Sequence, residues 1–232
     1  MKLELVLETV LYHATGEEDA LFRFYGDVLG LQRIGGGLTF RVGPGMLLLF
    51  NRERSSVQST PPPHGAAGPG HTCFVADDYE GWRQRIVDEG VAILEERTWD
   101  NGVRSFYFHD PAGNIVELIA HRGVDESERD GPFTAAELVG VSELGLVGDR
   151  RELAAALGEL GLAHWTGDLD AEGRLAFVGE KARTLILSPP GRGWLPTGRP
   201  SEPHPVDVTI TGTGRDGEVR LEDSGSVIRV RA

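Results

Sequence analysis

The chain has 232 residues, 40% of them hydrophobic and 25% charged, so it is long enough to bury the core of one large domain or two smaller ones. Its formal net charge of −13 excludes nucleic acid and an anionic membrane as main partners, because both need a basic footprint. The single cysteine excludes an intrachain disulfide, and no apolar run approaches the ~20 residues of a membrane span. Without a signal peptide at the N-terminus, we expect a cytoplasmic protein.

The first fifty residues predict a βαβββ unit. Residues 3–12 alternate in the manner of a strand. A helix is expected before Gly30, because apolar residues recur at helical spacing. Three short strands follow at residues 31–34, 38–42 and 46–50, separated by glycine-rich turns.

The same order returns after a polar stretch rich in proline and glycine at residues 51–70. We expect a strand at 71–76, a helix at 78–89 and a strand at 92–97. The last two strands of this second unit come from the stretch SFYFHDPAGNIVELI, residues 105–119, which reads as a β-hairpin because turn chemistry separates two strand-like runs.

The return strand of this hairpin contains one acid, Glu117. Alternation places Glu117 on one face with Ile115 and Ile119, while Val116 and Leu118 lie on the other face. A carboxylate with apolar neighbours is costly to bury unless a cation or hydrogen-bond donors meet it, or unless that face is wet. This position therefore predicts a metal, a positive partner or a solvent-filled face.

The second half of the chain predicts a decayed copy of the first. A charged linker at 124–132 separates a domain at 1–123 from a second one at 133–232. A third unit and a fourth, shortened unit without a helix are expected in the second domain. The predicted elements are a strand at 139–148, a helix at 150–161, strands near 163–167, 175–178 and 184–187, and final strands at 206–211, 218–222 and 227–230. The loop 189–205 shows too little periodicity for an element of its own.

Three phrases resemble the vicinal-oxygen-chelate superfamily, which includes glyoxalase I, bleomycin- and fosfomycin-resistance proteins, and extradiol dioxygenases. They are FRFYGDVLGL at 22–31, GPGHTCFVADD at 68–78 and FYFHDPAGNIVELIA at 106–120. The resemblance implies an α+β fold in which paired βαβββ modules form cupped mixed sheets, here as two tandem copies with the second degenerate. It also implies a divalent metal held by first and last strands of modules.

Carried over residue by residue, the family pattern puts metal ligands at Glu8, His71 and Glu117. Most relatives have a histidine where this chain has Glu8, and the fourth ligand position falls near Leu47, so open sites remain for water or substrate. Two carboxylates and one imidazole favour Mn, Fe, Ni or Zn without choosing among them. In the second half, the matching positions are Val141, Asp207 or Val206, and Arg229; an arginine cannot ligate a cation, so we expect one site per chain.

Further side chains are candidates for binding the substrate. His64 lies on the loop before His71, and Arg104 and Tyr107 lie on the first strand of the hairpin, where they are candidates to orient an anionic or phenolic group. The second half is expected to cover the cup, to form a dimer face or to narrow access through Trp194. We expect a small-molecule partner and a monomer or homodimer.

The leading hypothesis is a metal-dependent lyase, isomerase or transferase that acts on a small oxygenated metabolite through chelation of its oxygens. An extradiol-type dioxygenase is a related alternative, although the chain lacks the histidine-rich iron site that this resemblance implies. A metal-free protein that sequesters an aromatic or antibiotic ligand is another alternative, and a regulatory or scaffolding module is a third. A fragment of residues 1–123 is expected to retain the metal, since all three proposed ligands lie in it.

Overall fold

The structure is a computed structural model that describes residues 4–42, 45–51, 72–76, 79–99, 102–120, 138–180, 183–203 and 207–232. Within these residues, no helix has the length and apolar character needed to cross a membrane. The predicted linker at 124–132 lies outside the described residues.

The order of elements follows the repeated pattern of a strand, a helix and further strands. The first unit comprises β1 (Glu4–His13), α1 (Glu18–Phe22), the π-helical segment η1 (Arg23–Val28), β2 (Thr39–Val42) and β3 (Gly45–Asn51). The second comprises β4 (Thr72–Ala76), α2 (Tyr79–Asp88), β5 (Ile93–Thr98), β6 (Arg104–His109) and β7 (Ile115–Ala120). The third comprises β8 (Leu138–Val147), α3 (Arg150–Glu159), β9 (His164–Gly167), β10 (Ala176–Glu180) and β11 (Arg183–Ser188). The rest is β12 (Gly193–Trp194), β13 (Arg199–Pro200), β14 (Asp207–Thr211), β15 (Gly217–Leu221) and β16 (Ser226–Arg231).

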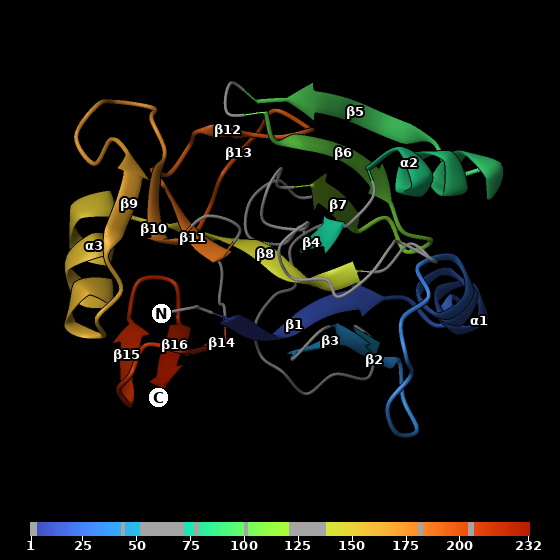
Figure 1. The fold of residues 1–232 in the computed structure, drawn as a ribbon, viewed down its shortest axis with the longest axis horizontal. Coiled ribbons are helices and arrows are strands. Elements are labelled where there is room, and N and C mark those ends of the chain that lie inside the picture. The colour runs from blue at the N-terminus through green and yellow to red at the C-terminus, as the bar shows by residue number, and fades with distance from the viewer. Residues whose placement is uncertain are drawn as a thin grey trace.

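Each of the two large sheets combines strands from both halves of the chain. The six-stranded sheet has the order β15-β16-β14-β1-β3-β2, and the eight-stranded sheet has the order β5-β6-β7-β4-β8-β11-β10-β9 (Figure 1). The first unit is therefore joined to the fourth, and the second to the third. The α+β class and the cupped mixed sheets were predicted from the sequence, but the division into domains 1–123 and 133–232 does not follow the sheets.

Two elements differ from the sequence prediction. The strand expected at 31–34 is reduced to a single bridge between Arg33 and Phe40, and the Arg33 side chain donates to the carbonyl oxygens of Gly36 and Gly37 in the following turn. The loop 189–205, for which no element was predicted, contains the short β12–β13 hairpin. Two-residue strands carry no readable periodicity, so this hairpin left no signal in the sequence.

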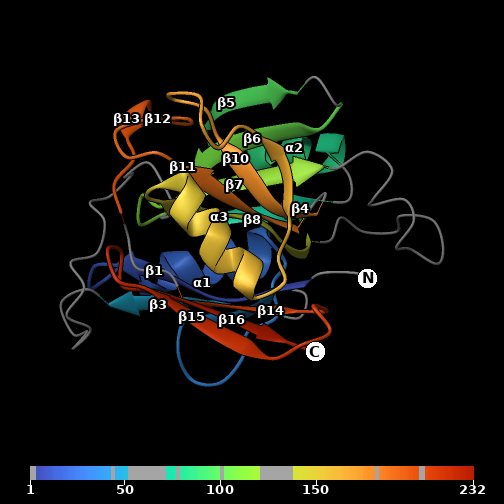
Figure 2. The ribbon, with the colours of Figure 1, turned by 90° about the vertical axis from the view of Figure 1, so that its left-hand side faces the viewer.

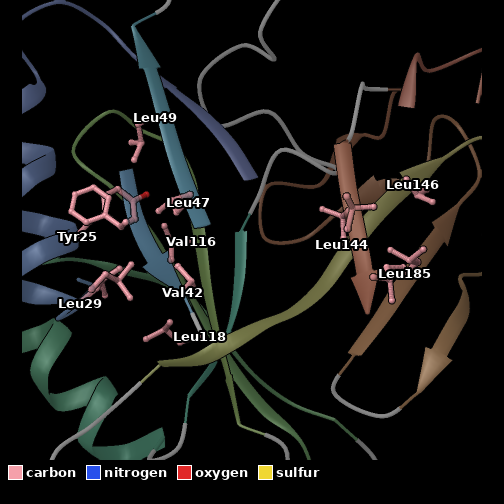
Figure 3. Packing of buried hydrophobic residues seen from close by; sticks show 14 of the residues in the cluster. Tyr25, Leu29, Val42, Leu47, Leu49, Val116, Leu118, Leu144, Leu146 and Leu185 are labelled. Atoms are coloured by element: carbon pink, nitrogen blue, oxygen red, sulfur yellow. The ribbon is translucent and has the colours of Figure 1, made fainter. Parts of the chain in front are cut away.

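The hydrophobic core lies on the helix-covered faces of both sheets. Val116 and Leu118 of β7 are fully buried and lie beside Val42 and Leu47 of the first unit (Figure 3). Helix α3 contacts β10 and β11 of one sheet and β15 of the other, and it lies between the two sheets in Figure 2. The core therefore joins the two halves of the chain.

The turn of the predicted hairpin forms as its sequence indicates. Both the Ala112 and Asn114 backbone N–H groups donate to Asp110 Oδ1, and Gly113 takes the left-handed conformation that the turn requires, with φ of 82°. Tyr25 of η1 donates its hydroxyl to Asp110 Oδ2 at 2.8 Å, and both side chains are buried. This contact attaches the helix of the first unit to the hairpin of the second.

Candidate functional site

One pocket of about 260 Å³ lies on the face of the eight-stranded sheet opposite the core. Its lining comes from β6 and β7 of the second unit, from all four strands of the third unit and from the β12–β13 hairpin. The lining residues are Trp99, Val103, Tyr107, Glu117, Ile119, Glu143, Trp165, Thr166, Leu175, Phe177, Ile186, Arg192, Trp194 and Leu195. The pocket thus combines residues from both halves of the chain.

Glu117 faces this pocket from β7. Its exposed fraction is only 2%, and Ile119 lines the pocket beside it, whereas Val116 and Leu118 enter the core. The alternation that the sequence predicted is confirmed. The carboxylate therefore lies in a mainly apolar recess, where an ionised acid needs a cation or hydrogen-bond donors.

A second acid, Glu143 of β8, lines the same pocket. In the register of the sheet, Cys73 of β4 is paired both with Glu117 and with Glu143. Because β4 lies between β7 and β8, the two glutamates belong to one row across three neighbouring strands. The pocket therefore contains two carboxylates contributed by two different units.

Sequence reasoning missed Glu143 and matched Val141 to the ligand position instead. The signal was present, because Glu143 is an acid inside an apolar strand, flanked by Ser142 and Leu144, as Glu117 is in its own strand. The pairing of β8 with β4 could not be predicted from the sequence, because it joins distant parts of the chain.

The predicted site residues are only partly brought together. Glu8, which the structure places by its backbone on β1, belongs to the six-stranded sheet, whereas Glu117 belongs to the eight-stranded one. The strand pairing therefore does not bring Glu8 beside Glu117. His64 and His71 lie outside the described residues; His71 directly precedes Thr72, the first residue of β4.

Tyr107 and Arg104 lie on opposite faces of β6. Tyr107 lines the pocket, is 3% exposed and is the register partner of Glu117. Arg104 does not line the pocket: its guanidinium lies 3.7 Å from the centre of the Tyr79 ring and donates to Glu80 Oε1 at 2.6 Å. The hydrogen bond to Glu80 raises the pKa of Arg104. Arg104 lies on the face away from this pocket because residues three apart on a strand point to opposite faces, and its substrate role stays a prediction.

Aromatic side chains form much of the pocket wall. Trp99 follows β5, Trp165 belongs to β9 and Trp194 belongs to β12. The β12–β13 hairpin lies next to β5 and β6 in both Figure 1 and Figure 2, and Trp194 is only 4% exposed. One of the three roles predicted for the second half, narrowing access through Trp194, agrees with this placement.

Arg192 adds a positive charge to the lining. It precedes β12 and donates from Nε to the Gly173 carbonyl at 3.0 Å and from Nη1 to the Gly193 carbonyl at 2.9 Å. Partial burial, and secondarily the nearby Arg174, lower the pKa of Arg192, although a guanidinium remains charged at neutral pH. Its place beside the pocket was not predicted.

Comparison with known proteins identifies the family. A sequence model of the Glyoxalase/Bleomycin resistance protein/Dioxygenase superfamily matches residues 13–118. A lactoylglutathione lyase from Agrobacterium tumefaciens is 37% identical over 50% of this chain and 93% of its own, with a TM-score of 0.40. The chain belongs to this superfamily.

The superfamily fold extends beyond the matched half. Two mutants of glyoxalase I from Zea mays each align with 98% of this chain at a TM-score of 0.56, covering 92% and 94% of their own chains. Their identities of 15% and 16% show a shared fold alone.

Members of this superfamily commonly bind a divalent metal, and the pocket chemistry fits such an ion. Glu117 and Glu143 are acceptor-only groups when ionised, and both line one largely apolar pocket. The described residues contain no group of three or more His, Cys, Asp or Glu side chains placed to hold a metal. His71, the predicted imidazole ligand, lies outside them, so Glu117 and Glu143 are the carboxylates of the pocket lining that the structure describes.

Proposed function

We propose that the protein is a divalent-metal-dependent enzyme that acts on a small oxygenated metabolite in the pocket of the eight-stranded sheet. The observation that carries this proposal is the convergence of Glu117 and Glu143 on one pocket with largely apolar walls. Glu117 is almost fully buried there and Glu143 is half-buried, and an ionised carboxylate in an apolar recess is stabilised by a cation.

The proposed ligands are Glu117, Glu143 and His71, with Mn, Fe, Ni or Zn as the ion. Glu143 replaces Glu8 in the set predicted from the sequence, because β8 and β7 belong to one sheet and β1 does not. When bound, the metal supplies a Lewis acid that stabilises negative charge developing on substrate oxygens.

The remaining pocket residues bind and orient the substrate. Tyr107 is the register partner of Glu117, so its hydroxyl belongs to the same face and is a donor for a substrate oxygen. The apolar walls, with the buried Trp194 of the hairpin among them, lower the local polarity and so strengthen electrostatic interactions inside the pocket. The reaction belongs to the lyase, isomerase or transferase types, and the relative from Agrobacterium tumefaciens is a lactoylglutathione lyase.

Metal analysis tests this proposal. We expect about one divalent ion per chain after reconstitution, and its loss in Glu117→Gln, Glu143→Gln and His71→Ala. Glu8→Gln is the matched control, because it makes the same chemical change on the other sheet and should leave the metal in place. Retention of metal in Glu143→Gln with loss in Glu8→Gln would restore the ligand set expected from the sequence.

A metal-free sequestering protein is the second candidate. It is favoured by the three tryptophans that line the pocket, since aromatic walls suit a planar ligand. Wild-type protein that takes up no metal yet binds an aromatic ligand tightly would replace the enzyme proposal with this one.

A further inference from the structure

The pocket lining contains a positively charged side chain, Arg192, to which the proposed metal chemistry gives no role. Two N–H groups of Arg192 donate hydrogen bonds to the carbonyl oxygens of Gly173 and Gly193. A guanidinium has five N–H donors, so three remain available for other partners. Among the described residues, no ion pair joins a carboxylate to Arg192, and the like charge of Arg174 lies near enough to lower the pKa of Arg192. In a chain of net charge −13, Arg192 is the one Lys or Arg among the described residues that line the pocket, and Arg174 lies outside that lining.

The position of Arg192 is held by hydrogen bonds to a loop that Arg150 organises. Arg150, only 8% exposed, donates through Nη1 to the carbonyl oxygens of Asp168 at 2.7 Å, Ala171 at 3.0 Å and Arg174. These contacts shape the loop between β9 and β10, and the Gly173 carbonyl of that loop receives the Arg192 Nε–H. The Arg192 guanidinium is therefore pre-organised, which reduces the entropy lost when it binds an anion.

The charge of the metal-loaded pocket indicates the charge of the ligand that would complement it. Two ionised glutamates neutralise one divalent ion, so the metal-loaded pocket keeps the single positive charge of Arg192. Trp165 and Trp194 line the same pocket as that charge. Aromatic faces stack on planar rings, and a desolvated guanidinium prefers a carboxylate or a similar anion.

We infer that the pocket takes an aromatic monoanion: a ring against the tryptophans, its negative group on Arg192, and a pair of neighbouring oxygens toward Glu117 and Glu143. This inference rests on the proposed function, because the metal completes the charge balance. It adds the substrate class, and it assigns Arg192 as the specificity-determining residue.

Calorimetry on the zinc-loaded full chain tests the inference, since zinc has no redox chemistry that would consume the probes. The first probe is 3,4-dihydroxybenzoate, which has a ring, two adjacent oxygens and a separate carboxylate. The second is its neutral amide, and the third is glycerate, which keeps the oxygens and the carboxylate without the ring. We expect the aromatic acid to bind at least about tenfold more tightly than either comparison compound, as a charge-assisted contact and ring stacking predict.

Variants locate the anion contact. Arg192→Gln should abolish the preference for the acid over the amide, and Arg192→Lys should keep part of it. Arg220→Gln, which removes the same charge from β15 of the other sheet, should keep all of it. Equal binding of acid and amide by the wild type overturns the inference without any variant, and equal binding of glycerate overturns the aromatic part.

Failure of the proposed function would give a different experimental result from failure of the inferred ligand class. If the protein takes up no zinc, the same three probes are measured on the metal-free chain. An Arg192-dependent preference for the aromatic acid there supports the ligand class while the enzyme proposal fails. Zinc binding without that preference supports the enzyme proposal while the ligand class fails.

Discussion

Glu117 of β7 and Glu143 of β8 share one register partner, Cys73 of β4, and both line the same pocket. Neighbouring strands are about 4.8 Å apart, so two strand spacings separate the backbones of the two acids by about 10 Å. Two glutamate side chains that extend from such positions can reach a common cation. The site therefore depends on the junction between the second and third units.

Metal should stabilise the wild type and not the ligand variants. At a free metal concentration about 100 times Kd, binding adds about 2.7 kcal/mol to the free energy of unfolding. We expect chelation to lower the Tm of the wild type and of Glu8→Gln, and to leave the Tm of Glu117→Gln and Glu143→Gln unchanged. Thermal unfolding with and without chelator measures this, and an equal shift in all four proteins would contradict the ligand set.

The buried contact between Tyr25 and Asp110 should contribute to stability. Tyr25→Phe removes the hydroxyl that donates to Asp110 Oδ2, and we expect the free energy of unfolding to fall by about 1–3 kcal/mol. Urea denaturation measures the loss, and an unchanged transition would show that water replaces the hydroxyl.

The contribution of Asp110 should depend on pH. Burial raises the pKa of this carboxyl above its ordinary value of 3.8, although four hydrogen bonds oppose the rise. A raised folded-state pKa gives stability that is fully present below the unfolded value and is lost as the pH rises through the folded value. The stability advantage of the wild type over Asp110→Asn should therefore shrink as the pH rises from 3.8 through the raised folded-state pKa. Urea titrations across this range would contradict the prediction if the advantage grew.

Arg150 should stabilise the loop that holds Arg192. Arg150→Met removes the guanidinium donor from three carbonyl oxygens, of which that of Ala171 keeps the Arg174 N–H. We expect a loss of about 2–3 kcal/mol in unfolding free energy together with weaker binding of the aromatic acid. Arg151→Met is the matched control: its exposed ion pair with Asp170 should contribute less than about 1 kcal/mol. Metal content should remain unchanged in both variants, and equal effects on stability would contradict the role assigned to Arg150.

The first half of the chain should not fold by itself. A fragment of residues 1–123 loses β14, the partner of β1, and β8, the partner of β4, and it exposes both strand edges. We now expect this fragment to aggregate and to regain a cooperative unfolding transition when mixed with residues 133–232. Size-exclusion chromatography and circular dichroism test this, and a folded monomer that holds metal alone would support the domain division expected from the sequence.

Local features of the chain were readable from the sequence because their causes are local. The alternation around Glu117 and the Asp110 turn depend on residues within a few positions of each other, and both form as predicted. The family resemblance also indicated the cupped fold. The sequence by itself thus determined the units, their order and the face on which Glu117 lies.

Only the tertiary structure decided which units meet. Strand pairing between β4 and β8, and between β1 and β14, joins residues far apart in the chain, and backbone hydrogen bonds of a sheet leave no pattern in side-chain order. That pairing places Glu143 in the pocket and Glu8 in the other sheet, and it brings Arg192 and Trp194 over the face that carries Glu117. The composition of the site is therefore a consequence of long-range pairing, whereas its first acid was visible from alternation alone.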